Sequence, residues 1–537
     1  GPGGIIPPGR RRLSPCLLSV NSQITGSDTV ILAAILAVCG AWFGLANPVA
    51  RLPLLMLLLP AGLAYLAIRA DTARQAAKWT YWTGAVAAAG NLYWTSLPVH
   101  DFGGMPWVLA VPVPILMGLV LGAYAAALAL AWRFGASRLP AWLFLPYAAA
   151  AWTVMELLRG TLFTGFPWLT MAAAFSPWPM AVQGAAFLGA YGLSGLLAAL
   201  AAAPAVYGLF SRPTLAVVLI AAALAFLGNR RLAEPVPRIA AAHVTLVQGN
   251  VDQSRKWAPE AEEETVEKYI ELSRRALSDA PSDLLVWPET SMPFFYQDGG
   301  PLAQRVRDFV ASAGVPLVFG APAYERTLGG HVLYNRAFLL APDGRTAGYD
   351  KEHLVPFGEY VPLGQYLTFI GKLVEGVGDF KPGASAAPLH QGDLALGTLI
   401  CYEAIFPELA QKRVEAGANV LVNISNDAWF GDTAAPRQHL DLALLRAVEQ
   451  GRALIRGTNT GISAVIDPRG RVMAQGGLFS ALALPCPETP IVSETTWYHR
   501  CYGLITWGLP ALFVLLGLAA CLRPVRSRDR RPGGLTL

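Results

Sequence analysis

Residues 394–403 read Leu-Ala-Leu-Gly-Thr-Leu-Ile-Cys-Tyr-Glu, an apolar run that ends on a thiol and a carboxylate. A short apolar run of this length is typical of a strand buried in a sheet. In layered α/β folds, reactive side chains tend to lie just past the carboxyl ends of strands. Cys401 has that position, so it is a candidate nucleophile, although a lone cysteine after an apolar strand is often only a buried and inert residue.

Other short β-rich runs surround this strand and alternate with helical patterns. Residues 262–277 and 438–455 carry apolar side chains at spacings of three and four, which predicts amphipathic helices. Gly344 in Pro-Asp-Gly-Arg and Gly470 in Asp-Pro-Arg-Gly mark hairpin turns. The pattern favours an α/β layered fold with two sheets covered by helices. The remaining strands are expected at 240–248, 283–287, 316–320, 336–340, 419–424 and 463–467.

Two further reactive side chains follow strands. Glu289 comes after the run 284–288, and Lys351 follows a hairpin strand near 347–349. A carboxylate, an ammonium and the Cys401 thiol at one rim would form a nucleophilic site, in which the base takes the thiol proton and the ammonium stabilises an oxyanion. Each residue also has a purely structural explanation, since Glu289 suits a helix cap and Lys351 suits a solvated surface. Spacing alone leaves these alternatives open.

The composition excludes an ordinary soluble protein. Of the 537 residues 54% are hydrophobic and only 14% are charged, and the mean hydropathy is +0.42. Charge-free runs between residues 30 and 229 predict seven transmembrane helices within 29–232, and the long run 160–211 requires a loop before a helix at about 182–209. The run 501–522 predicts an eighth helix, whereas 235–500 has the composition of a soluble domain.

Basic residues set the expected orientation. The short loops that carry Lys and Arg all fall on one side if the helices alternate, and such loops mark the cytoplasmic side. The prediction is a cytoplasmic segment 1–28, whose first three residues resemble a cloning remnant, and a basic cytoplasmic tail 523–537. The domain 235–500 is then outside, which in a bacterium is the periplasm. A signal peptide at 10–50 is the competing interpretation, but no small-residue cleavage site is followed there by a soluble stretch.

Three motifs give these residues a family context. Trp287-Pro288-Glu289, the run Lys-Glu-His-Leu-Val-Pro-Phe-Gly-Glu at 351–359, and Cys401-Tyr402-Glu403 appear in the order Glu, Lys, Cys. This order resembles the carbon-nitrogen hydrolase (nitrilase) superfamily, and in particular its membrane-bound branch, the apolipoprotein N-acyltransferases. The resemblance covers nearly the whole chain. It implies a polytopic α-helical membrane protein with about eight transmembrane helices, carrying an extramembrane nitrilase-like domain folded as an αββα sandwich. Further matches are Gln248-Gly249-Asn250, Lys256-Trp257, Leu158-Arg159-Gly160, Thr164-Gly165-Phe166-Pro167-Trp168 and Asn426-Asp427-Ala428-Trp429-Phe430-Gly431.

The resemblance also implies a reaction. A phospholipid such as phosphatidylethanolamine gives its sn-1 acyl chain to a thiol by a ping-pong mechanism, and the thioester then acylates the N-terminal amine of the diacylglyceryl-cysteine of an apolipoprotein. This step completes lipoprotein maturation at the bacterial inner membrane. The implied roles are nucleophile for Cys401, general base for Glu289 and oxyanion partner for Lys351. Supporting residues are Tyr402, Glu403 and Glu359, the last of which either orients Lys351 or transfers a proton. The substrate-binding candidates are Trp257, Arg159, Trp168, Asn335 and Trp429.

The expected partners are a phospholipid, a diacylglyceryl apolipoprotein and the bilayer, without nucleic acid. No metal or other cofactor is expected, because the seven His are scattered and the phosphate-cradling motif is missing. Two rival functions remain: a membrane-tethered amidase that hydrolyses a small substrate, and a transporter with an external domain. Cys486 and Cys501 either pair as a disulfide or stay free. The apolar stretches 360–363 and 366–370 either dip into the leaflet and gate the site or pack on the domain.

Overall fold

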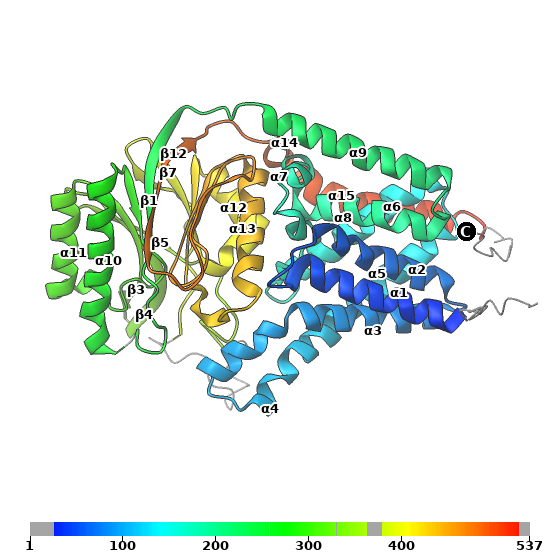
Figure 1. The fold of residues 1–537 in the computed structure, drawn as a ribbon, viewed down its shortest axis with the longest axis horizontal. Helices are drawn as coiled ribbons and strands as arrows, with labels where there is room; N and C mark the ends of the chain where they lie inside the picture. Colours follow the sequence, from blue (N-terminus) through cyan, green and yellow to red (C-terminus); the bar gives the residue numbers. More distant parts are fainter. Residues whose placement is uncertain (1–25, 257, 329, 362–378, 526–537) are drawn as a thin grey trace, which may run out of the picture.

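The computed structural model describes residues 26–256, 258–328, 330–361 and 379–525, and it divides into a helical bundle and an α/β domain (Figure 1). The bundle contains the N-terminal helices and the last helix, which returns from the domain to pack beside α6 and α8. The main helices of the bundle are α1 (Gly26–Ala41), α2 (Leu58–Arg69), α3 (Ala73–Asn91), α5 (Pro112–Ala136), α6 (Ala141–Thr161), α8 (Ala185–Tyr207), α9 (Arg212–Ala233) and α15 (Tyr502–Cys521). Four-residue helices α4 (Trp107–Ala110), α7 (Pro179–Val182) and α14 (Trp497–Arg500) lie between them.

The bundle has the character of a multi-pass membrane protein. Among the described residues, six helices are long and apolar enough to cross a membrane: Ser27–Ala46, Trp107–Ala136, Ala141–Thr161, Ala185–Tyr207, Arg212–Ala233 and Tyr502–Cys521. The apolar helix Pro53–Arg69 is shorter, and α3 carries Arg74 and Lys78 near its start. Transmembrane character is therefore confirmed, while the exact count of eight spans stays a prediction.

The long apolar run 160–211 is interrupted, as the sequence predicts. After α6 the chain forms two short 3-10 turns, η5 (Pro167–Leu169) and η6 (Met171–Phe175), before α8 begins at Ala185. This looped segment is buried between the bundle and the domain, where Met171, Ala172 and Phe175 join the shared apolar core. It therefore forms part of the bundle surface against which the domain packs.

The domain is an αββα sandwich, which confirms the predicted fold class. One six-stranded sheet has the order β12-β1-β2-β3-β4-β5 and the other β11-β10-β9-β8-β7-β6. Helices α10 (Pro259–Asp279) and α11 (Gly300–Ala313) cover the first sheet, while α12 (Pro407–Glu415) and α13 (Ala435–Gln450) cover the second on the side of the bundle (Figure 1). The strands are β1 (Ala240–Gln248), β2 (Leu284–Val286), β3 (Leu317–Thr327), β4 (Gly330–Leu340), β5 (Thr346–Asp350), β6 (Leu389–Gln391), β7 (Leu394–Ile400), β8 (Val420–Ser425), β9 (Leu454–Thr458), β10 (Ala464–Ile466), β11 (Val472–Gln475) and β12 (Leu482–Ile491).

Apolar side chains from both sheets fill the space between them, including Val244, Val286, Ile400, Val422 and Ile455. The hairpin turns at Gly344 and Gly470 form as predicted, with left-handed φ angles of 85° and 79° that suit glycine.

One predicted helix is wrong at its end. The pattern at 438–455 continues through Leu454 and Ile455, but α13 stops at Gln450 because Gly451 takes a left-handed conformation with φ of 64°. Leu454–Thr458 then forms β9, which pairs with β8 and β10 in the middle of the second sheet. Leu454 and Ile455 are apolar because they are buried in the sheet. Apolar spacing in the sequence does not distinguish residues buried in a sheet from residues on the buried face of a helix.

Helix α13 fastens the domain to the bundle. The side-chain oxygen of Gln438 accepts hydrogen bonds from the indole of Trp94 at 3.0 Å and the indole of Trp168 at 2.7 Å. Asp441 on the same helix forms an ion pair with Arg51, and Glu449 accepts from the backbone of Ala190 at 2.6 Å. These buried polar contacts fix the register of the two parts, since each would cost free energy if it were left unmade.

Cys486 and Cys501, which the sequence left either paired or free, are both free thiols.

Candidate active site

A cavity of about 540 Å³ lies between the bundle and one rim of the domain. Its apolar wall comes from the bundle and includes Trp94, Val99, Met117, Phe166 and Trp168. The opposite wall comes from the domain and includes Gln253, Lys256, Glu289, Asn335, Lys351, Glu359, Cys401, Tyr402, Asn426, Trp429 and His439. A largely apolar space with a few convergent polar groups is typical of a ligand site, and this one has room for a lipid chain.

Cys401 lies where β7 ends, at the first residue of a 3-10 turn, and its backbone is strained. Its φ of 52° is in the left-handed region that non-glycine residues rarely adopt, and such strain often marks a functional position. The carbonyl of Cys401 accepts hydrogen bonds from Asn423 Nδ2 at 3.3 Å and His439 Nε2 at 3.1 Å, which hold this conformation. Burial, reinforced by Glu289, raises the pKa of the thiol above its usual value, although Lys351 opposes the shift. The resting thiol is therefore protonated and needs a base to become a nucleophile.

Glu289 supplies a carboxylate held in one orientation. It follows β2 through Trp287 and Pro288, and it is 6% exposed. One carboxylate oxygen accepts from Asn335 Nδ2 at 2.8 Å, and the other accepts from the backbone N–H of Asn426 at 2.9 Å. The turn fits against β3 only because position 320 is glycine, where a Cβ would lie 2.7 Å from the Cα of Glu289. The helix-cap alternative is excluded, because this carboxylate lines the cavity instead.

Lys351 is buried, at 1% exposure, so the solvated-surface interpretation is excluded. Its Nζ lies 2.9 Å from Glu359 Oε2 and 3.6 Å from Glu289 Oε1. Burial alone would lower the pKa of Lys351, but the carboxylates of Glu359 and Glu289 outweigh it and raise the pKa, so the amine stays charged. Glu359 also accepts from Asn335 Nδ2 at 2.8 Å and from the backbone of Val355 at 2.8 Å. This fixed position favours orientation of Lys351 as the role of Glu359.

The supporting residues of the motifs divide into two groups. Tyr402 lines the cavity, and its hydroxyl donates to the carbonyl of Gly165 at 3.1 Å, which joins the domain to the loop before η5. Glu403 is fully buried and accepts from the backbone of Ile400 at 2.6 Å and of Glu352 at 2.7 Å. Glu403 therefore ties the strand end before Cys401 to the chain just after Lys351, which sets the relative position of the thiol and the amine.

The substrate-binding candidates fare differently. Trp168, Asn335 and Trp429 line the cavity, and Trp429 packs edge-on against Phe102 of the bundle at 4.6 Å between ring centroids. Trp257 lies outside the described residues, as do the apolar stretches beyond residue 361 that the sequence suggested as a gate. Arg159 is described but is not part of this cavity wall.

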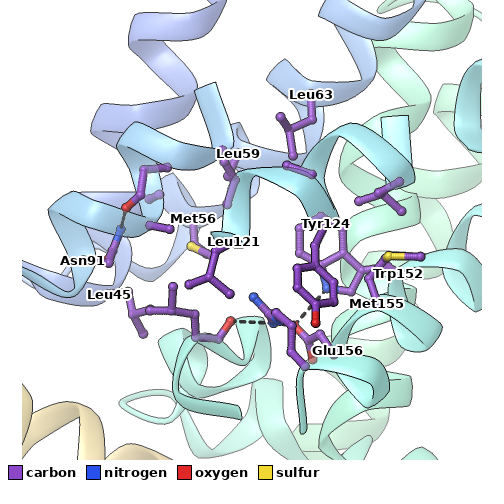
Figure 2. Close-up of a pocket in the computed structure, with 18 residues that line it drawn as sticks. Leu45, Met56, Leu59, Leu63, Asn91, Leu121, Tyr124, Trp152, Met155 and Glu156 are labelled. Atoms are coloured by element: carbon purple, nitrogen blue, oxygen red, sulfur yellow. Dashed lines mark hydrogen bonds and ion pairs between the residues drawn. The ribbon is translucent and has the colours of Figure 1, made fainter. Parts of the chain in front are cut away.

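Arg159 borders a second, smaller cavity of about 80 Å³ inside the bundle, whose walls are mostly leucine, methionine and alanine. Figure 2 shows this pocket with Glu156, Trp152 and Tyr124 among the residues that line it, and the indole of Trp152 donates to Glu156 Oε1 at 2.9 Å. Glu156 Oε1 accepts from the backbone of Met171 at 2.9 Å and lies 3.4 Å from Arg159 Nη2, which itself donates to the carbonyl of Leu169 at 3.1 Å. Glu156 and Arg159 therefore form an ion pair, and its contacts with Leu169 and Met171 hold the segment that follows Trp168.

Several cavity residues had no assigned role in the sequence. Asn426 and Asp427 belong to a quoted motif, but nothing indicated that the Asn426 backbone would hold Glu289. His439 gave no signal at all, because it lies near the start of α13, within a run whose apolar spacing predicts only a helix. Behind Cys401, Asp427 forms a buried ion pair with Arg456 at 2.7 Å, and burial together with Arg456 lowers the pKa of His439. His439 is held between these groups, with Nδ1 3.0 Å from Asp427 Oδ1 while Nε2 donates to the carbonyl of Cys401.

Comparison with known proteins agrees with this architecture. Residues 243–483 match the family model of the carbon-nitrogen hydrolases, and residues 39–203 match that of the apolipoprotein N-acyltransferase N-terminal domain. The fold and the first match define the class, a nitrilase-superfamily domain on a membrane bundle. A crystallised Nesterenkonia amidase of that superfamily is 21% identical and aligns over 50% of this chain and 96% of its own, with a TM-score of 0.37.

Relatives that align with most of this chain define the branch. An apolipoprotein N-acyltransferase from Geobacter metallireducens is 40% identical over 454 residues, which cover 82% of this chain and 85% of that protein. One from Nitrosomonas europaea is 34% identical over 467 residues, covering 85% and 89%. The chain belongs to the apolipoprotein N-acyltransferase family and is a multi-pass membrane acyltransferase.

Proposed function

We propose that this protein transfers the sn-1 acyl chain of a phospholipid, such as phosphatidylethanolamine, to the N-terminal amine of the diacylglyceryl-cysteine of an apolipoprotein. One observation carries the proposal. Glu289, Lys351 and Cys401 face one cavity whose opposite wall is formed by apolar side chains of the membrane bundle. An acyl chain is stabilised by contact with such an apolar wall, because its hydrocarbon surface is removed from water. A small water-soluble substrate gains little from it.

In the first half-reaction Glu289 takes the Sγ proton and the thiolate of Cys401 attacks the carbonyl carbon of the sn-1 ester. The charge that develops on the carbonyl oxygen is stabilised by the ammonium of Lys351, which the two neighbouring carboxylates keep protonated. The carbon–oxygen bond then breaks, the glycerol oxygen takes the proton from Glu289, and a lysophospholipid leaves. The enzyme retains the acyl group as a thioester.

In the second half-reaction the free amine of the acceptor attacks the thioester carbonyl. Glu289 takes a proton from the attacking nitrogen, Lys351 again faces the oxyanion, and the carbon–sulfur bond breaks. The Cys401 sulfur recovers its proton through Glu289, so the enzyme returns to its starting state. The products are an amide on the acceptor and free enzyme, and no other reactant is needed.

The transfer is tested by supplying both substrates. Purified protein incubated with phospholipid and a diacylglyceryl-cysteine peptide should yield lysophospholipid and a peptide heavier by one acyl group, in equal amounts by mass spectrometry. A membrane-tethered amidase, the second candidate, would resolve the thioester with water. Free fatty acid as the main product, with the peptide unchanged, would therefore overturn the transferase and favour hydrolysis.

We also propose that the domain lies in the bacterial periplasm and that both termini lie in the cytoplasm, because the basic loops share one side. Alkaline phosphatase is active only after export. Fusion after Leu537 should therefore be inactive, whereas fusion of the chain truncated after Ser493, before α15, should be active. The opposite pair of results would reverse the orientation, and equal activity of both fusions would show that α15 does not span.

A further inference from the structure

Lys256 is a second buried cation at the cavity, and the two half-reactions do not use it. It lies in the loop between β1 and α10, is 1% exposed and forms part of the cavity wall. Among the described residues its Nζ makes one long hydrogen bond, 3.4 Å to the backbone carbonyl of Glu289. An ammonium has three N–H donors, so the described part of the chain satisfies only part of its hydrogen-bonding capacity.

The contrast with Lys351 shows what Lys256 lacks. Lys351 is neutralised by two carboxylates within 3.6 Å, whereas Lys256 forms no ion pair with any acidic side chain among the residues that the structure describes. Burial lowers the pKa of Lys256 to about 8, although Glu289 opposes the shift. A buried cation without a counter-ion is costly, and the cost is recovered when an anion binds beside it.

We propose that Lys256 binds the phosphate of the donor phospholipid, and so makes the site select a phosphate-bearing lipid for the first half-reaction. The inference rests on the proposed function. The donor carries a phosphodiester on the same glycerol as the sn-1 ester, so a cation near Glu289 suits the phosphate when the ester carbonyl is at Cys401. The acceptor has no phosphate and carries an amine, which an unpaired ammonium would not favour. Lys256 thus distinguishes the two lipid substrates by charge.

The test compares two donors that share acyl chains and glycerol but differ in phosphate: phosphatidylethanolamine and diacylglycerol. Acyl loading of Cys401 is followed by mass spectrometry under single-turnover conditions. Lys256→Gln should slow loading from the phospholipid on the order of 10- to 100-fold, the loss expected for a charge-assisted hydrogen bond, and should change loading from diacylglycerol much less. Lys256→Arg should recover part of the phospholipid rate.

Lys268→Gln is the matched control. Lys268 is half-buried nearby on α10, also donates to a backbone carbonyl at 3.4 Å, and does not line the cavity. This variant removes the same charge and should load at the wild-type rate from both donors. If wild type does not use diacylglycerol, competition by two non-cleavable diether lipids, with and without phosphate, provides the same comparison: only the phosphate-bearing one should compete less well against Lys256→Gln.

Three outcomes would overturn the assignment. An equal loss with both donors would make Lys256 a support for Glu289, and no loss with either would leave it without a role in loading. Inorganic phosphate that binds wild type but not Lys256→Gln, without slowing loading from the phospholipid, would assign the site to a free anion. Wild type that loads from neither donor would refute the proposed function itself, which is a distinguishable result.

Discussion

Cys401→Ala should gain no acyl mass when it is incubated with phospholipid, whereas wild type should gain the mass of one acyl chain. The thioester accumulates in wild type because the cavity is apolar and the acceptor amine is missing, so little competes for the acyl group. Intact-protein mass spectrometry measures the adduct, and neutral hydroxylamine should release it as expected for a thioester. We expect a loss on the order of 10⁴-fold or more, as for other removed nucleophiles.

Cys486→Ala is the control for this experiment, since Cys486 is a buried free thiol of the same domain outside the cavity wall. It should load as wild type does. An acyl adduct that persists in Cys401→Ala, or that disappears in Cys486→Ala, would contradict the assignment of the nucleophile.

Lys351→Met should lower the acyl-loading rate by about 10²–10³-fold, equivalent to roughly 2.7–4 kcal/mol of lost oxyanion stabilisation. Methionine is unbranched and only slightly shorter than lysine, so the substitution removes the charge with little change of shape. The rate is measured in single turnover with saturating phospholipid, so that weaker substrate binding does not account for the loss.

Lys412→Met is the comparison, because Lys412 is half-exposed and pairs with Glu352 on the surface. It should load normally. Removal of the Lys351 charge also leaves Glu289 and Glu359 without their shared cation, so the thermal unfolding midpoint of each variant must be measured alongside. Normal loading by a folded Lys351→Met protein would show that this amine does not act on the oxyanion.

The strands that carry the site were largely predictable from local sequence. Residues 240–248 and 394–400 form β1 and β7 with the predicted bounds, because a short apolar run with polar or turn residues at its end has few other uses. The rule that chemistry follows strand ends then brought Glu289 and Cys401 to one rim. The helix at 438–455 failed at Gly451, where one left-handed residue ended a pattern that apolar spacing alone continued.

The surroundings of these residues were not predictable in the same way. Glu289 is held by a backbone N–H of Asn426, and Glu156 by a backbone N–H of Met171, and backbone partners leave no mark in the sequence. The apolar wall of the cavity is even harder to predict, because the sequence around Trp94 and Val99 indicates only a membrane helix. Their place in the cavity depends on how the domain docks on the bundle, which is set by α13 and not by any local pattern.

The hydrogen bond from Trp94 to Gln438 joins residues 344 positions apart in the chain. At about 5–20 residues per second, a ribosome reaches Gln438 roughly 20–70 s after Trp94. The lipid-facing half of the cavity is therefore synthesised, and available for insertion, well before the half that bears the thiol. The apolar wall of the cavity is therefore made before the rim that bears the catalytic residues. The cavity itself can form only after α13 has been synthesised and has packed against the bundle.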